Sequence, residues 1–421
     1  MKRIICILIV LALGCSILAG CDKKATTVNL MENISAKLVE NTEEVSLYEY
    51  GPKLNDFAIR LFNSCRTSSE NTGNMLVSPL SVILALSMTA NGADGETLAQ
   101  MEKTLGISKD ELNRFAKSYM AILSERNPET GKLKLANSIW FTSDERFAVE
   151  QSFLQTNADY FGADIYKAPF DSSTLKAIND WVNEKTDKMI PSILNEIPPA
   201  ALMYLVNALA FDAKWAEPYY DYQVRKDIFM TDDGKAQENE YLYGEENQYL
   251  EDEKATGFIK YYKGYKYAFA ALLPNEGISV DAYLDSIDGA HLSEMLENKK
   301  RNTVYTAIPK FKTEYSIEMS EQLKRMGMAD AFDIGAADFR KLGTSSAGNI
   351  FISRVIHKTF IEVDENGTKA GAATVVEMKD GAALITEEPK KVYLTRPFVY
   401  MLIDCQTNSP FFIGVMRNLE G

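Results

Sequence analysis

Histidine is nearly absent from this sequence: among 421 residues there are only His291 and His357. Zinc sites and Ser-His-Asp hydrolases rely on histidine, so both kinds of site are poorly supported. The sequence also lacks an HExxH motif, a CxxC pair, a phosphate-binding P-loop and a GxGxxG dinucleotide fingerprint. From residue content alone we expect neither an enzyme nor a bound metal or cofactor.

Cysteine is scarce as well, with five residues in the chain. Cys6 and Cys15 lie near the N-terminus, and Cys21 follows them. The other two, Cys65 and Cys405, are too few for the disulfide framework of a small secreted domain. We expect both to be buried small side chains, with a long-range disulfide between them as the alternative.

A basic excess is missing too. Lys and Arg number 45 against 59 Asp and Glu, a formal net charge of −14. Proteins that bind nucleic acid without sequence preference present a basic face, so we expect no nucleic-acid partner. The chain is 46% hydrophobic, enough for a large core, and beyond Tyr48 it has no linker-like tract and no internal repeat. This favours a single large domain that spans residues 46–421.

Residues 1–20 have the pattern of an export signal. Lys2 and Arg3 precede an apolar run that is too short for an ordinary membrane span. The run ends in Leu-Ala-Gly-Cys, which resembles a bacterial lipobox, where the cysteine (here Cys21) is lipidated and becomes the first residue. We therefore expect an exported protein, anchored by lipid on the outer side of a bacterial membrane, with a polar tether over residues 21–45. A plain signal peptide, or lipidation at Cys15, are the alternatives.

Hydrophobic spacing predicts helices in the first part of the domain and mostly strands afterwards. Apolar residues at three- and four-residue spacing between Leu54 and Cys65 predict an amphipathic helix. Residues 75–90 are apolar on all sides and predict a central helix, with Ser78 and Pro79 at its start. A further helix is expected over 175–190, and strands over 204–210, 258–262, 267–273, 303–308, 351–363 and 398–403. This order predicts an α+β fold.

Three other segments could carry chemistry, and each has a plainer interpretation. Residues 343–348 resemble a nucleophile loop without a histidine partner, so we expect a flexible loop. The acidic residues between 245 and 253 lack the spacing of a calcium loop, which favours a solvated face. Residues 260–267 mix basic and aromatic side chains, as a nucleic-acid site would, but their alternation predicts strand, turn and strand.

The most unusual segment runs from residue 362 to residue 389. It is rich in small residues that cannot fill a core, so we expect it to be exposed, and exposed loops of this length are often functional. Small or β-branched residues nevertheless alternate along one face, as in a strand that is buried on one side: Thr368, Ala370, Ala372, Thr374 and Val376. An exposed loop that has the residue pattern of an internal strand indicates a switch between two states.

A series of motifs across residues 46–421 resembles the serpin family in order and spacing. They are NMLVSPLS (74–81), GADGET (92–97), INDWV (178–182), LVNALAFDAKW (205–215), IPKFK (308–312), MG (326–327), ADF (337–339), VIHKT (355–359) and RPF (396–398). The resemblance implies three β-sheets with eight or nine helices. It also implies a reactive loop, here about residues 367–389, that a serine or cysteine protease cleaves as bait.

The resemblance further implies that the cleaved loop inserts into the main sheet as an extra strand and carries the acylated protease with it. About 14 residues at about 3.3 Å each would span about 46 Å, the scale of a whole domain. The uncut state would then be metastable and held by kinetics rather than by equilibrium.

Individual site residues follow from the resemblance by motif. The shutter, a buried polar network where the sheet opens, would comprise Ser78, Ser81, Asn207 and His357. The breach at the top of the sheet would comprise Trp215, Lys310 and Glu365, with an ion pair between the last two. The hinge of the loop would comprise Glu365, Gly367, Thr368, Ala370, Ala372, Ala373 and Thr374. At Lys369 the family usually has an acidic residue, but this side chain should face solvent.

The hinge separates an inhibitor from a non-inhibitory serpin that acts as a binding or carrier module. Its inward positions carry neither charge nor proline, which favours inhibition. A solute-binding lipoprotein would fit only the anchor and the size. We expect a monomer.

The position of the reactive bond follows from a count along the loop. Fourteen residues from Thr368 place it between Gly381 and Ala382, within a window from Met378 to Thr386. Counting back from the RPF motif instead gives a point near Thr386, so the loop is longer than usual on its C-terminal side. Small and apolar residues around the bond suit elastase-like or subtilisin-like proteases.

Overall fold

The computed structural model describes residues 26–37, 46–68, 73–126, 130–197, 202–346, 348–368 and 388–419. The predicted signal segment and Cys21 lie outside the described residues. So do Gly381, Ala382 and the hinge residues Ala370, Ala372, Ala373 and Thr374. The predictions for these residues stay predictions.

Nine α-helices and three β-sheets form in the described part of the chain, which confirms the predicted α+β fold. The helices are α1 Gly51–Ser68, α2 Pro79–Ala90, α3 Gly95–Leu105, α4 Lys109–Glu125, α5 Gln151–Phe161, α6 Ser172–Lys185, α7 Val280–Leu284, α8 Gly289–Glu297 and α9 Ser320–Arg325. None of them is long and apolar enough to cross a membrane.

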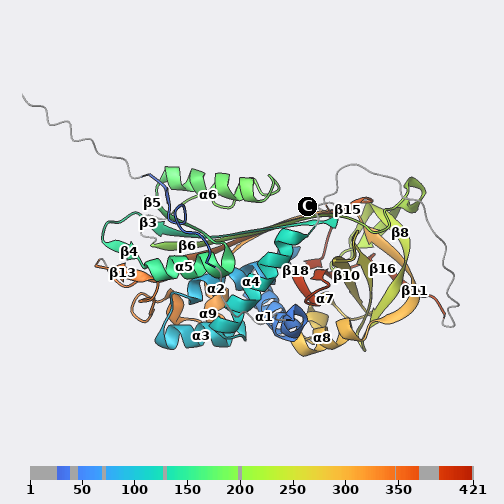
Figure 1. Cartoon of the computed structure of the whole chain (residues 1–421). Helices are drawn as coiled ribbons and strands as arrows, with labels where there is room; N and C mark the ends of the chain where they lie inside the picture. The colour runs from blue at the N-terminus through green and yellow to red at the C-terminus, as the bar shows by residue number, and fades with distance from the viewer. Residues whose placement is uncertain are drawn as a thin grey trace, which may run out of the picture.

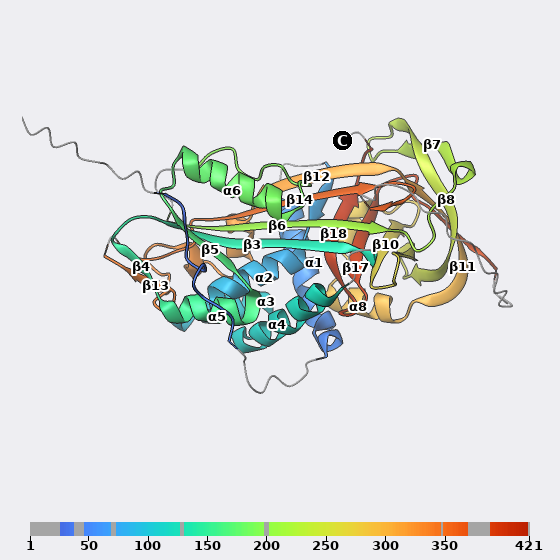
Figure 2. The same cartoon turned by 45° about the horizontal axis from the view of Figure 1, so that its top comes forward.

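The first sheet runs along the long axis of the molecule (Figure 2). Its seven strands, in spatial order, are β1 Val28–Asn29, β5 Asp164–Ala168, β3 Lys132–Thr142, β6 Met203–Lys214, β15 Gly367–Thr368, β14 Arg354–Val363 and β12 Phe311–Glu318. Helix α6 covers one face of this sheet, and α2 lies against the other (Figure 1).

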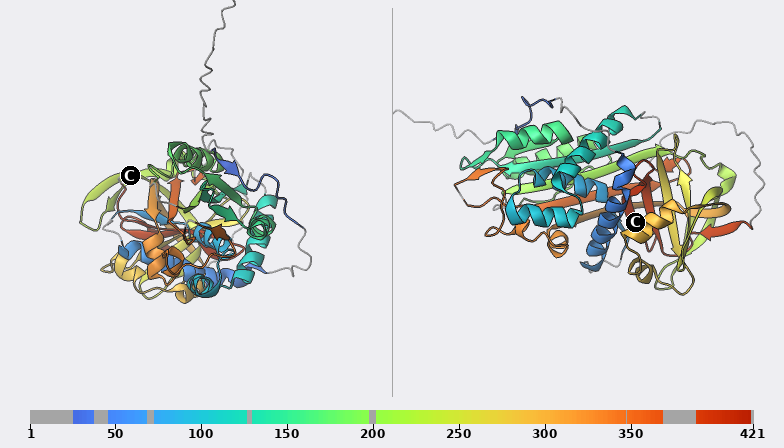
Figure 3. Two further views of the ribbon diagram at one scale, coloured as in Figure 1. Left: turned by 90° about the vertical axis from the view of Figure 1, so that its left-hand side faces the viewer. Right: turned by 60° about the horizontal axis from the view of Figure 1, so that its bottom comes forward.

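The second sheet lies at the other end of the molecule, beside α7 and α8 (Figures 1 and 3). Its strands, in spatial order, are β16 Lys390–Tyr393, β11 Lys300–Pro309, β8 Ala236–Glu251, β9 Ala255–Tyr261, β10 Tyr267–Pro274, β17 Phe398–Asp404, β18 Ser409–Met416 and β2 Met75–Val77, while β7 Val224–Met230 pairs with β8. A small third sheet joins β4 Phe147–Val149 to β13 Gly343–Ser345.

The predicted central helix is shorter than expected. Helix α2 begins at Pro79, where the side chain of Ser78 accepts a hydrogen bond from Ser81 N, and every residue of the helix is buried. Residues 75–77 are instead the strand β2, which pairs with β18. A proline at the first helical turn fixes this boundary, because its ring is tolerated only there.

The predicted helix over 175–190 corresponds to α6. Asp171 caps it by accepting hydrogen bonds from Ser173 N and Thr174 N. Ile178, Trp181 and Val182 form its buried face, which packs on β3, β6 and β14. Ile190 is buried but lies beyond the end of the helix.

Two local expectations differ from the structure. The segment 343–348, expected as a flexible loop, contains the strand β13 paired with β4. Part of the predicted tether lies on the domain, because β1 pairs with β5 and Leu30, Met31 and Ile34 pack against the core. These three apolar residues and the unpaired edge of β5 provide the physical reason.

The two cysteines of the domain are not joined. Cys65 is buried and Cys405 is half-buried, and neither forms a disulfide bond. The alternative of a long-range disulfide is therefore wrong. Burial raises the pKa of both thiols to about 12, so they stay protonated at neutral pH.

Candidate functional site

The first sheet is open between its two central strands. Strands β6 and β14 pair in parallel only over residues 204–209 and 354–359. Above this region the described strands diverge, and β15 lies between them, antiparallel to both. The start of the loop therefore occupies the position of a missing strand.

Thr368 is the hinge residue that has already entered the sheet. It is opposite Ala213 on β6 and Val363 on β14, and its exposed fraction is 0%. Its hydroxyl lies 2.5 Å from the hydroxyl of Tyr262, which is also fully buried. The period-two pattern of the loop therefore begins in register with an internal strand, as its small side chains predict.

Gly367 allows the close approach of the loop to β6. A Cβ atom at this position would lie 2.1 Å from the carbonyl oxygen of Ala213, a distance that real Cβ atoms do not reach. Glycine at the first inserted position is thus a steric requirement of the sheet.

The turn before the hinge is held by three hydrogen bonds from the segment that follows β6. Trp215 Nε1 donates to Asp364 O, and Trp215 N donates to Asn366 O, each over 2.9 Å. Tyr219 N donates to Glu365 O, also over 2.9 Å. Every carbonyl of the turn 364–366 therefore has a partner on residues 215 or 219.

The structure brings the predicted breach residues together. Lys310 Nζ lies 3.0 Å from Glu365 Oε2 and 2.9 Å from Glu240 Oε2. The side chain of Lys310 is about one-third exposed, so each ion pair contributes little to stability. Trp215 is almost fully buried and stacks on Tyr262 with ring centroids 4.5 Å apart.

The four predicted shutter residues form one network below the opening. His357 Nδ1 lies 2.5 Å from Asn207 Oδ1, directly across the β6–β14 pair. Ser78 N donates to His357 Nε2 over 3.1 Å, and Ser81 N donates to Ser78 Oγ over 3.3 Å. A strand that extends between β6 and β14 as far as residues 207 and 357 must break the contact between His357 and Asn207.

Asn137 belongs to the same network but was missed in the sequence. Its Oδ1 accepts a hydrogen bond from Asn207 Nδ2 over 2.7 Å, and its Nδ2 donates to Ser81 O over 3.2 Å. The only available signal was an amide within the apolar half of β3, a run that the hydrophobic analysis did not single out.

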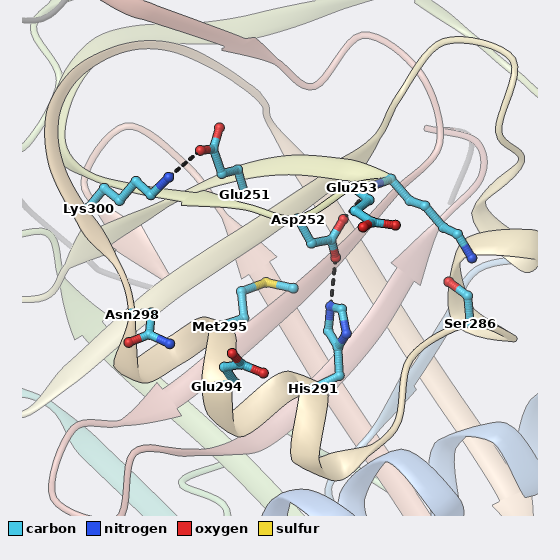
Figure 4. Close-up of a pocket in the computed structure, with 10 residues that line it drawn as sticks. Glu251, Asp252, Glu253, Ser286, His291, Glu294, Met295, Asn298 and Lys300 are labelled. Carbon is cyan, nitrogen blue, oxygen red and sulfur yellow. Dashed lines mark hydrogen bonds and ion pairs between the residues drawn. The ribbon is translucent and has the colours of Figure 1, made fainter.

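The acidic segment at residues 245–253 is not a free cluster of carboxylates. Asp252 Oδ2 lies 2.8 Å from His291 Nε2 (Figure 4). The same oxygen accepts a hydrogen bond from Tyr283 over 2.9 Å. Glu251 pairs with Lys300 in the same surface pocket. Among the described residues no group of three or more His, Cys, Asp or Glu side chains is arranged to hold a metal ion.

The segment 260–267 forms the predicted strand, turn and strand. Lys260 ends up in the interior rather than at the surface, with an exposed fraction of 5%. Tyr262 and Tyr267 are also buried. The alternation therefore predicted the backbone correctly but not the burial of the lysine.

Comparison with known proteins identifies the family of this site. A family model described as Serpin (serine protease inhibitor) matches residues 52–419. Leukocyte elastase inhibitor A of Mus musculus is 30% identical over 377 residues, covering 85% of this chain and 96% of the mouse protein. An uncharacterized serpin-like protein of Thermococcus kodakarensis is 28% identical over 370 residues, covering 87% of this chain and 84% of that protein.

Solved structures agree. The thermophilic serpin tengpin in its native state matches with a TM-score of 0.86 and 47% sequence identity, covering 94% of this chain and 100% of that one. Tengpin in its latent state matches with a TM-score of 0.77 and 45% identity, covering 90% and 100%. The described conformation is thus nearer to the native state of that protein.

The burial of His357 predicts a pH dependence of stability. Burial lowers the pKa of His357 to about 3, below the value of about 6.5 in an unfolded chain. Its stabilising contribution is therefore complete above about pH 6.5 and decreases as the pH falls toward 3. Between about pH 7.5 and pH 5.5 the loss should be about 1.4 kcal/mol, measured as a drop in the melting temperature of the intact protein.

His357→Gln should lessen this pH-dependent drop, although it also lowers stability at neutral pH. The matched control is His291→Gln at the other histidine, whose side chain is 38% exposed and which should keep the drop of the unaltered protein. Equal drops in both variants would exclude His357 as the source.

Proposed function

The chain belongs to the serpin family. From this premise we propose that it inhibits endopeptidases of the serine type, with the cysteine type as a further target class, by acting as a suicide substrate. The observation that carries the proposal is the strand β15, where Thr368 already lies between β6 and β14. A loop that has begun to enter the sheet, and whose next inward residues are all small, is suited to continue. The similarity to a leukocyte elastase inhibitor supports the same function.

The proposed reaction uses the nucleophile of the protease. The nucleophile attacks the carbonyl carbon of the reactive bond, the peptide bond breaks, and the new amino terminus leaves with the C-terminal part of the loop. The protease stays attached as an acyl-enzyme. The freed loop then inserts from Thr368 downward and moves the protease away before water can hydrolyse the ester.

The energy for insertion comes from the sheet itself. Each inserted residue adds backbone hydrogen bonds to β6 and β14, at a net gain of about 1 kcal/mol per bond. The inward side chains expected at positions 370, 372 and 374 are small and need little space, whereas a charge would be costly to bury. A carrier protein has no need of such a hinge, so the hinge favours inhibition.

The proposed target has a shallow or broad specificity pocket. The bond between Gly381 and Ala382 is flanked by small and apolar residues, which suit elastase-like or subtilisin-like proteases. Trypsin-like proteases need a basic residue, and the nearest is Lys379. Cleavage there would shorten the inserted segment, and the protease should then escape more often.

A protease panel tests this proposal. The intact protein should form an SDS-stable complex with elastase or subtilisin, at a higher ratio of complex to cleaved product than with trypsin. The released peptide should begin at Ala382 or within about three residues beyond it, as measured by mass. Efficient trapping of trypsin with a peptide that begins at Asp380 would contradict both the bond and the target class.

Thr368→Arg tests insertion itself. An arginine at this fully buried position would place an uncompensated charge in the sheet, so insertion should slow and the variant should become a substrate. We expect continued cleavage of the loop with loss of most of the covalent complex, read from the two bands on a gel. Lys369→Glu is the control: the charge changes at a position whose side chain should face solvent, and trapping should persist.

We also propose that the protein is exported and held at the outer side of a bacterial membrane by a lipid on Cys21. The proposal rests on the apolar run of residues 4–17 and the Leu-Ala-Gly-Cys sequence after it. Two further outcomes are possible at this terminus: cleavage as a plain signal peptide, or lipidation at Cys15.

Cys21→Ala separates these outcomes. The variant should lose metabolic labelling with a radioactive fatty acid and move from the membrane fraction to the medium or to an unprocessed precursor. Cys15→Ala is the matched control and should be labelled normally. Lipid uptake by Cys21→Ala would exclude Cys21 as the anchor.

A further inference from the structure

A buried ion pair lies beneath the hinge, and neither the fold nor the proposed reaction accounts for it. Lys260 on β9 places Nζ 2.7 Å from Glu246 Oε1 on β8. The side chains are only 6% and 14% exposed. Buried ion pairs are weak evidence for stability, because apolar residues of similar volume are often at least as stable. The position of the pair therefore points to another role.

The ammonium group of Lys260 contacts both aromatic side chains that border the turn before the hinge. It lies 4.4 Å from the ring centroid of Tyr219 and 5.4 Å from that of Trp215. It also donates a hydrogen bond to Glu217 O over 3.2 Å. We call Trp215 and Tyr219 the aromatic clamp. One cation thus touches both members of the clamp and the backbone between them, and such contacts are strongest where water is excluded.

The opposite side of the aromatic clamp holds the loop. Its backbone and indole N–H groups satisfy the three carbonyls of residues 364–366, as described above. Trp215 also stacks on Tyr262, whose hydroxyl contacts Thr368. A continuous chain of contacts therefore leads from Lys260 to Thr368 in the strand β15.

The close contact between the two groups favours the charged form of each. Burial is the largest single influence and lowers the pKa of Lys260, but Glu246, Tyr219 and Glu217 together outweigh it, and the pKa lies above its usual value. Glu246 gains its stabilisation from the same contact, which opposes the rise in its pKa caused by burial.

We propose that Lys260 and Glu246 are positioning residues for loop insertion: through the aromatic clamp they keep Thr368 in the sheet before the protease arrives. The inference rests on the proposed inhibitory function and names residues that set its efficiency. Insertion competes with hydrolysis of the acyl-enzyme, so a hinge that starts inside the sheet favours trapping. The first cleavage step should not depend on the pair, because the aromatic clamp holds residues 364–366, which come well before the predicted reactive bond in the sequence.

The test replaces both charges together. Lys260→Met or Glu246→Leu alone leaves an unpaired buried charge and should lower the melting temperature. In the double variant Lys260→Met/Glu246→Leu two apolar side chains occupy the space of the ion pair, and most of the lost melting temperature should be recovered. The contact between a cation and the aromatic clamp stays absent in this variant. Arg417→Met is the control for destabilisation, because its nearly buried side chain pairs with Asp281 and touches none of these residues.

The first measurement needs no protease. In the background Thr368→Cys, thiol labelling at position 368 is followed by peptide mass spectrometry, which separates it from labelling of the native cysteines. The double variant should be labelled about tenfold faster than the parent, the shift expected for a loss of about 1.4 kcal/mol of contact energy. Arg417→Met should not accelerate labelling.

The second measurement is the ratio of cleaved product to covalent complex after reaction with a protease. With elastase or subtilisin, the double variant should give several-fold more cleaved product per covalent complex, at an unchanged rate of initial loop cleavage. A double variant that recovers both its melting temperature and the parental ratio would show that the pair is only structural, and unchanged labelling would likewise overturn the inference. Absence of any complex in the parent protein would instead refute the proposed function, while labelling would still decide whether the pair holds the hinge.

Discussion

The position between β6 and β14, which among the described residues only β15 occupies, is the constraint on which the rest of the structure depends. The parallel strands β6 and β14 pair only over residues 204–209 and 354–359. Above this region the backbone groups of one strand are not hydrogen-bonded to those of the other. Buried N–H and C=O groups are costly when unpaired, so the sheet gains free energy whenever a strand fills the position. In the proposed function the loop supplies that strand, and β15 lies where its entry would begin.

The groups that join β6 and β14 below this position are polar, and their chemistry suits the switch in the proposed function. His357 and Asn207 join the two strands through one short hydrogen bond, which has no intermediate arrangement once the strands move apart. Apolar contacts could slide past one another, whereas a directional bond either holds or breaks. Helix α6 adds a second barrier, because its buried face belongs to the same apolar cluster as residues of both strands that must separate.

Much of this arrangement could be predicted from the sequence, and the failures share one cause. Helices α1 and α6 followed from their spacing of apolar residues, and the burial of Thr368 agrees with the alternation predicted for the hinge. Asn137 and the Lys260–Glu246 pair were missed because their partners lie far away in the sequence or on another strand: Asn137 meets Ser81 and Asn207 at separations of 56 and 70 residues. A single polar residue in a strand gives no sign of whether it faces water or a distant partner.

The location of charge at the breach follows from the two tasks of this region. Lys310 and Glu365 lie next to the start of β15 and remain partly exposed. Water can therefore take the place of either partner at little cost when the ion pair separates. Lys260 and Glu246 lie one layer deeper, where separation would leave a charge without solvent. An exposed pair therefore suits the part of the hinge that must move, and a buried pair suits the support that must stay in place while the loop moves past it. The same residue types thus perform opposite tasks at two depths of one site.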